Sequence, residues 1–281
     1  MSAAIGSAIR AGGLDGVLLA RSERGDGRHQ VVLARLGGRE VVVKLYGRKR
    51  GHVPTALRAF GHRFLVGKTG LSARARRDTE ARVVGLWREH GFAAPALLEL
   101  SLPEPVAQPY LVLERIAGPT VDARLRDAGA PQAELEAALR RFAADWSRRH
   151  ALAERLGEPG LVHAHAGFTH LLEGGGAWTY FDFEYAYTDV RRVEQLVAVE
   201  IAGFVASLRR AAGTRAVPLL RALVEGYTDR GRLRRAATQG AVGRFRGLER
   251  VARVLPGLRG RGPRKLRESV AALESELQRA R

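Results

Sequence analysis

The sequence contains no cysteine, one methionine and, by count, only four lysines among its 281 residues. Without cysteine there can be no disulfide bond, thiolate metal site or cysteine nucleophile within this sequence. This composition is consistent with a reducing compartment. The first twenty residues lack the early basic stretch of a secretory signal peptide. We therefore expect a cytoplasmic protein, either free or peripheral at the inner face of the membrane.

Long apolar runs are also missing. A membrane-spanning helix needs roughly 20 consecutive apolar residues, and the longest candidate, residues 196–208, is shorter and contains Glu200. Apolar residues nevertheless make up 46% of the chain, which is enough for a sizeable core. The sequence therefore predicts a globular protein without a membrane span.

Negative charge is scarce, and the formal net charge is +18. Residues 45–78 contain nine basic residues and one acid, and residues 209–281 contain nineteen basic residues and six acids. Such stretches attract an anionic acceptor, such as a phosphorylated glycolipid or sugar, or an anionic membrane surface. An arginine-rich composition typical of a GC-rich genome gives the same bias, and both readings stay open. Nucleic acid is a less favoured partner, because the basic stretches lack interleaved aromatic residues.

The first half of the chain reads as strands with one helix. Gly37-Gly38 is a two-residue hairpin signal, and a helix over about 73–90 ends at Gly91. The predicted strands are 16–21, 30–36, 39–46, one that opens at Pro95, and 110–114.

The second half reads as mainly helical. Its predicted elements are a helix over 132–150, a two-stranded segment of 160–163 with 178–182, a helix that contains 193–208, and a last helix through Leu266 and Leu277. Strands and helices are thus segregated, which predicts an α+β fold with two lobes. We place a β-rich lobe at 1–117 and a helical lobe at 118–281.

Lys44 lies between large apolar residues on a predicted strand. A buried ammonium group needs a partner, because an unpaired buried charge is very costly. Glu80 on the following helix is the candidate partner, and a Lys–Glu pair of this kind fixes the lysine head for binding the phosphates of ATP. The alternative is a lysine on the solvent face of an edge strand.

A second group of polar residues lies in the middle of the chain, where His163, His165 and His170 fall within eight residues. Asp182 follows at the end of an apolar strand, where a carboxylate can reach a magnesium ion. The three imidazoles could instead form a zinc or iron site. Glu200 is expected either to bind backbone N–H groups around His163 or to pair with an arginine.

The order and spacing of these elements resemble the protein-kinase-like superfamily from about residue 14 to 210. Val41-Val-Val-Lys44 looks like the Val-Ala-Ile-Lys strand, and Asp182-Phe-Glu184 looks like the Asp-Phe-Gly metal motif in an Asp-Phe-Glu form. His163-Ala-His165 stands where the catalytic loop belongs. Among the branches, the chain most resembles bacterial lipopolysaccharide core (Kdo/heptose) kinases and aminoglycoside-phosphotransferase-like proteins.

The resemblance implies ATP and Mg²⁺ (or Mn²⁺) as cofactors. It implies that Lys44 and Glu80 bind the nucleotide, together with Glu114 and Ile116 in the hinge that follows the strand 110–114. The glycine-rich loop of the family is only partly present, as Gly25 and Gly27.

The same resemblance assigns catalysis to His165 and Asp182, and the metal to Asp182 and His170. His165 replaces the family's catalytic aspartate and His170 replaces its asparagine. A histidine can act as a general base near neutral pH. Two functions therefore compete: an active kinase for an anionic acceptor, and a pseudokinase that binds nucleotide or acts as a scaffold or regulator. A basic nucleic-acid-binding module is a third reading.

Overall fold

The structure is a computed structural model that describes residues 8–11, 14–21, 29–47, 69, 72–174, 177–239 and 262–279. Gly25, Gly27, most of the basic stretch 45–78 and part of the stretch 209–281 lie outside these residues. The chain divides into two compact units. The first unit consists of Met1–Ala117 and Thr179–Thr188, and the second consists of Gly118–Trp178 and Asp189–Arg281.

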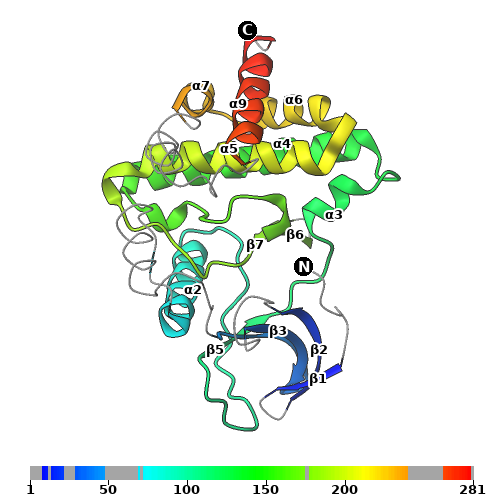
Figure 1. Cartoon of the computed structure of the whole chain (residues 1–281), viewed down its shortest axis with the longest axis vertical. Coiled ribbons are helices and arrows are strands. Elements are labelled where there is room, and N and C mark those ends of the chain that lie inside the picture. Colours follow the sequence, from blue (N-terminus) through cyan, green and yellow to red (C-terminus); the bar gives the residue numbers. More distant parts are fainter. Residues whose placement is uncertain are drawn as a thin grey trace, which may run out of the picture. The chain divides into compact units, whose positions relative to one another are not determined.

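The first unit is built on a five-stranded antiparallel sheet of order β1-β2-β3-β4-β5 (Figure 1). Its strands are β1 (Ala8–Ala11), β2 (Leu14–Arg21), β3 (Gln30–Leu36), β4 (Arg39–Leu45) and β5 (Tyr110–Glu114). Gly37 and Gly38 join β3 to β4 with φ values of 58° and 77°. A two-residue hairpin with positive φ at both positions favours glycine, and the predicted strands and hairpin of this region are confirmed.

Side chains on one face of the strands form the core of this sheet. Val32, Val41, Val43 and Val112 are among its buried residues, and each points to the same apolar cluster. Because side chains of a strand alternate between faces, the burial of Val43 puts Lys44 on the opposite face. Lys44 is nevertheless buried, at 5% exposure. The alternative of a lysine on a solvent-exposed face is therefore wrong.

Helix α2 (Ala73–Glu89) completes the first unit. Its N-terminus is capped by Ser72, whose hydroxyl accepts a hydrogen bond from the Ala75 backbone N–H at 3.1 Å. Gly91 follows the helix with a φ of 73°, the left-handed conformation that commonly ends helices. Glu80, Val84 and Trp87, at positions i, i+4 and i+7, lie on the buried face of the helix.

The strand predicted to open at Pro95 is wrong. The described chain forms no strand there: it makes an isolated bridge between Leu97 and Leu113 and two backbone hydrogen bonds, from Leu98 N to Val112 O at 2.9 Å and from Glu114 N to Ala96 O at 2.8 Å. Prolines are frequent in the stretch 95–109. Since proline donates no backbone hydrogen bond, Pro103, Pro105 and Pro109 limit how far the segment after Pro95 can pair.

The second unit is mainly helical, as the α+β prediction requires. Its helices are α3 (Val121–Arg126), α4 (Gln132–Leu156), α5 (Val193–Ala212), α6 (Ala216–Gly226), α7 (Arg230–Gln239) and α9 (Gly262–Arg279). Short 3-10 turns occur at Pro159–Leu161, Phe168–His170, Val190–Arg192 and Gly213–Arg215. Helix α4 packs against α6, and α5 packs against α7 and α9 (Figure 1). No helix in the described ranges is long and apolar enough to cross a membrane.

The two-stranded segment predicted for this region has one wrong strand. The observed pair is β6 (Leu171–Gly174) with β7 (Ala177–Tyr180). The stretch predicted as the first strand begins in a 3-10 turn, Pro159–Leu161, because Pro159 opens the turn and Glu158 caps it. The sequence signal for the true pair is Gly174-Gly-Gly176, a glycine run suited to a short connection.

Candidate functional site

Lys44 is the centre of a buried ionic cluster in the first unit. Its Nζ atom lies 2.8 Å from Oε2 of Glu80 and 2.6 Å from Oδ1 of Asp182. The partner expected for Lys44 is thus present, and Asp182 is a second one. The Lys44 and Glu80 side chains are 6% and 3% exposed, whereas that of Asp182 is 24% exposed. Of the two carboxylates, only that of Asp182 is substantially open to a ligand.

Lys44 is charged in this environment. Burial by itself would lower the pKa of Lys44, but the surrounding carboxylates, that of Asp182 first and that of Glu80 next, outweigh burial and raise the pKa above its ordinary value. The ammonium group can therefore meet an anionic ligand in the charged form at neutral pH.

Tyr46, which sequence reasoning missed, helps to fix Glu80. Its hydroxyl group donates a hydrogen bond to Oε2 of Glu80. Burial, followed by the negative charge of Glu80, raises the pKa of Tyr46 well above its ordinary value, so the phenol stays protonated and remains a donor. Glu80 also accepts a hydrogen bond from the Phe183 backbone N–H at 3.3 Å. Glu80 is therefore satisfied by the protein itself and acts as a support for Lys44.

Asp182 has an unusual backbone conformation. Its φ of 68° makes it the one non-glycine residue with a positive φ in the described ranges. The left-handed region is sparsely populated by non-glycine residues, although aspartate tolerates it better than most. Phe183 is packed beside it against Trp87 of α2, with ring centroids 4.8 Å apart. The residue that carries the accessible carboxylate is therefore held between fixed neighbours.

A second ion pair joins α2 to the same segment. Nη1 of Arg76 donates to Oε2 of Glu184 at 2.8 Å, and the other amino group of Arg76 donates a short hydrogen bond to the carbonyl of Gly47. His29 lies nearby, with Nε2 at 3.7 Å from Oε2 of Glu184. Sequence reasoning missed the Arg76–Glu184 pair. The signal available was the Asp-Phe-Glu form of the motif, whose glutamate needs a partner when it is buried.

The predicted hinge residues differ in their backbone bonding. The Glu114 N–H donates to the Ala96 carbonyl at 2.8 Å, and its carboxylate accepts from the Ala96 N–H at 3.1 Å. The backbone N–H and the carboxylate of Glu114 are therefore both hydrogen-bonded within the protein. Ile116 follows the end of β5 and is half-buried, and within the described part of the chain its backbone makes no hydrogen bond.

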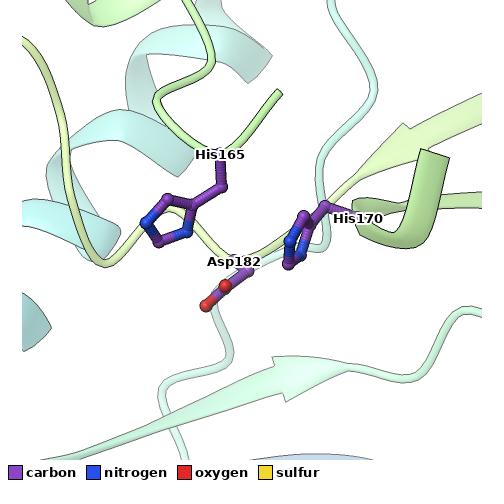
Figure 2. A group of neighbouring side chains, drawn as sticks. All are labelled: His165, His170 and Asp182. Carbon is purple, nitrogen blue, oxygen red and sulfur yellow. The ribbon is translucent and has the colours of Figure 1, made fainter. Parts of the chain in front are cut away.

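The predicted histidines lie together in the second unit. His165 and His170 have ring centroids 5.7 Å apart, and those of His163 and His170 are 6.1 Å apart. Figure 2 shows His165 and His170, which come from the loop before β6 and from the 3-10 turn at its start. Asp182, the third side chain drawn there, belongs to the first unit. His163 is buried, and burial lowers the pKa of its imidazole to about 3, so the ring is neutral.

Glu200 on α5 anchors the loop that carries these histidines. Its Oε2 accepts a hydrogen bond from the His163 backbone N–H at 2.9 Å, and its carboxylate pairs with the fully buried guanidinium of Arg149 on α4. Trp146 and His150 of the same helix also reach this carboxylate. Burial alone would raise the pKa of Glu200, but the charges and hydrogen bonds of Arg149 and His150 together outweigh burial, and the pKa lies below its ordinary value. Both roles considered for Glu200 are therefore present at once.

Comparisons with known proteins give structural likenesses only. A scan against protein-family models gives no match, and a search of curated proteins gives none either. Among solved structures, the chain is similar to Rio2 kinase from Chaetomium thermophilum, solved as an ADP/Mg²⁺-phosphoaspartate complex, with 17% identity and a TM-score of 0.40 over 94% of this chain and 73% of that chain. It is also similar to a protein named as a fructosamine-3-kinase from Haemophilus somnus 129PT, with 9% identity and a TM-score of 0.38 over 92% of both chains. At scores this low, neither likeness assigns a family or a function to this chain.

Proposed function

We propose that the chain is an ATP-dependent phosphotransferase of the protein-kinase-like fold. The observation that carries the proposal is the buried contact of Lys44 with both Glu80 and Asp182. A charged lysine supported by one inaccessible carboxylate, and placed beside a second that is accessible, suits the binding of a metal–phosphate group. The acceptor is a hydroxyl of a lipopolysaccharide-type sugar or another anionic molecule.

Lys44 is the residue that we assign to the phosphates of ATP. Glu80, which is itself held by Tyr46, holds the ammonium group from the protein side, so little side-chain entropy is lost when a phosphate binds. The role of Glu80 is to position Lys44, because its carboxylate is nearly inaccessible and already accepts bonds from the protein. Ile116 supplies backbone groups for an adenine ring, as the resemblance to kinases implies.

The residues around Asp182 fit a hard divalent cation. The ligand atom is a carboxylate oxygen, which Mg²⁺ prefers. The ionic cluster contains two cations, Lys44 and Arg76, and three carboxylates, those of Glu80, Asp182 and Glu184, so its formal charge is −1. When bound, Mg²⁺ or Mn²⁺ would neutralise charge on the phosphate oxygens. Asp182 would hold the metal, and His170 remains a proposed second ligand on the grounds of the resemblance.

His165 is proposed as the group that accepts the proton of the acceptor hydroxyl. Phosphoryl transfer passes through a loose transition state in most analyses, so positioning and charge neutralisation contribute more than proton removal. We therefore assign His165 a modest share of the rate. The acceptor is proposed to be anionic because of the positive charge of the chain, which would also attract an anionic membrane surface.

A pseudokinase is the second candidate, and one observation favours it. His165 and His170 stand where the resembled family has an aspartate and an asparagine, so two of its catalytic side chains are changed. The Lys44 cluster would then bind nucleotide without turnover, and the chain would act as a scaffold or regulator.

A phosphoryl-transfer assay distinguishes the kinase from the pseudokinase. The full chain is incubated with γ-labelled ATP, with Mg²⁺ or Mn²⁺, and with phosphorylated sugars or lipopolysaccharide core fragments as acceptors. Label transferred by the wild type, lost in Asp182→Asn and reduced in His165→Ala supports the kinase. Metal-dependent nucleotide binding without transfer to any acceptor or water supports the pseudokinase. Transfer that is unchanged in Asp182→Asn would rule out the proposed role of this residue.

A further inference from the structure

Arg76 and Glu184 form an ion pair that the proposed chemistry does not use. Both side chains are almost completely inaccessible, at 0% and 4% exposure, and the N–O distance is 2.8 Å. Arg76 also donates to the carbonyl of Gly47, which lies two residues beyond the end of β4. Glu184 is thus tied through one guanidinium both to α2 and to the end of the strand that carries Lys44.

The stability of the core does not account for this pair. Removing two charges from water is expensive, and apolar residues of similar volume often replace a buried ion pair without loss of stability. What an ion pair adds over apolar packing is direction, because a carboxylate and a guanidinium fix each other's orientation through hydrogen bonds. A directional anchor is useful where a neighbouring group must be held in a defined geometry.

Asp182 is such a group, two residues before Glu184. Its φ of 68° belongs to a sparsely populated region that persists only where the surroundings fix it. On the N-terminal side, the backbone is fixed by the bond from Tyr180 N to Ala93 O at 3.1 Å. On the C-terminal side, it is fixed by the bond from the Phe183 N–H to Glu80 and by the side chain of Glu184 on Arg76.

We infer that Glu184, anchored by Arg76, is a positioning residue that fixes the Asp182 carboxylate in the conformation that binds the metal of the nucleotide complex. The inference rests on the proposed function. Glu184 does not touch the ligand in this account. It acts as the outer support of a metal ligand, a kind of residue whose loss typically weakens metal affinity by about 10- to 100-fold.

The test separates orientation from charge. Replacing both residues, in Arg76→Met/Glu184→Leu, keeps the formal charge of the cluster and leaves no unpaired buried charge. For the full chain, the dissociation constant of ATP is measured by calorimetry with excess Mg²⁺ and again with a chelator. The ratio of the two constants gives the contribution of the metal to binding. In the double variant we expect this contribution to fall about tenfold or more, while the affinity for metal-free ATP is unchanged.

Two further variants complete the experiment. Arg76→Lys keeps a cation opposite Glu184 and is expected to retain most of the metal contribution. Glu154→Gln is the matched control in the second unit, because it removes a comparable carboxylate from its pair with Arg232 at 2.8 Å. This control is expected to lower the melting temperature and leave the metal contribution unchanged.

The outcomes distinguish the inference from the proposed function. A wild-type chain that binds no ATP with or without Mg²⁺ would overturn both. A wild type whose ATP binding is metal-dependent, together with a double variant that keeps the metal contribution, would overturn the positioning role alone. An equal loss of metal-free and metal-bound affinity would also overturn it, because that result indicates a general structural role. If the double variant does not fold, Arg76→Gln/Glu184→Gln, which also keeps the formal charge of the cluster, is measured in its place against the same control, with the same criteria.

Discussion

Oδ1 of Asp182 lies 2.6 Å from Nζ of Lys44, although the two residues are 138 positions apart in the sequence. Lys44 comes from the fourth strand of the sheet, and Asp182 comes from the segment that follows β7. Both belong to one compact unit, even though the whole stretch Gly118–Trp178 between them belongs to the other. The contact therefore fixes the segment Thr179–Thr188 beside Lys44. The proposed nucleotide site is based on this arrangement of Lys44 and Asp182.

Removal of Lys44 is expected to have two effects. Lys44→Met leaves the carboxylates of Glu80 and Asp182 close together without a cation. Loss of one partner of a buried ion pair costs about 3–5 kcal/mol, and protonation of one carboxylate would offset part of this loss. We expect a drop in the free energy of unfolding, measured by urea denaturation, together with loss of ATP binding.

The matched control for Lys44→Met is Arg115→Met. Arg115 pairs with Glu40, but the two side chains are 37% and 46% exposed. Exposed pairs of this kind contribute less than about 1 kcal/mol, and Arg115→Met should retain ATP binding. If Lys44→Met is as stable as this control and binds ATP as well as the wild type, Lys44 has no special role.

Tyr46→Phe tests the support of Glu80. The variant removes one hydroxyl group and leaves the ring in place, so Glu80 loses one donor while its bond to Lys44 remains. A hydrogen bond to a charged group typically contributes about 1.5–3 kcal/mol. We expect a loss of stability in this range and a weaker ATP complex, with turnover per bound ATP little changed. A variant that is as stable as the wild type and binds ATP equally well would show that Tyr46 does not support the site.

Glu200→Gln tests the anchor of the histidine loop. The variant leaves the guanidinium of Arg149 buried without an opposing charge, which is expected to cost about 3–5 kcal/mol in the free energy of unfolding. Glu225→Gln is the control, because the pair of Glu225 with Arg140 is partly exposed, at 41% and 44%. A difference of less than about 1 kcal/mol between the two variants would contradict the importance of the buried cluster around Glu200.

The buried imidazole of His150 is expected to make the stability of the protein depend on pH. Burial lowers the pKa of His150 from 6.5 to about 4, although Glu200 opposes this shift. Below pH 6.5 the unfolded chain therefore binds a proton at this position that the folded chain does not. The free energy of unfolding should fall by about 1.4 kcal/mol per pH unit as the pH drops from 6.5 to about 4. Above pH 6.5, His150 is neutral in both the folded and the unfolded chain, and the stability that its neutral form contributes is fully present.

The corresponding variant is His150→Gln, which does not titrate. It is expected to be less stable than the wild type at pH 7, because it changes the contacts to Tyr227 and Glu200. The difference between the two proteins should shrink as the pH falls toward 4, since only the wild type loses the contribution of His150. A difference that is constant with pH, in urea denaturation at a series of pH values, would show that His150 is not held neutral.

Much of the fold could be predicted because its signals are local. Short runs of valine and leucine mark β3 and β4, and the pair Gly37-Gly38 marks the turn between them. The α2 helix follows the strand of Lys44 in the chain and contains a glutamate, which is why Glu80 could be proposed as the partner of Lys44 from sequence alone. The strand expected after Pro95 was wrong, and the prolines at 103, 105 and 109 only limit how far this segment can pair.

The rest depends on contacts between distant residues. Nothing in the local sequence around Arg76 pairs it with Glu184, which is 108 positions away, and nothing around Arg149 pairs it with Glu200. Arginine is so common in this chain that composition gives no reason to single out either residue. Tyr46 was missed for a similar reason, since a tyrosine at the end of an apolar strand reads as core and its hydroxyl contact is visible only in three dimensions.

The most direct test of the central claim is a thermal-shift titration of the wild type and Lys44→Met with ATP, with and without Mg²⁺. A ligand that binds only the folded state raises the melting temperature. We predict a rise for the wild type with ATP, a larger rise with Mg²⁺ and ATP together, and none for Lys44→Met. The absence of any shift for the wild type, with ATP or GTP and with Mg²⁺ or Mn²⁺, would contradict the proposal that Lys44, Glu80 and Asp182 form a nucleotide site.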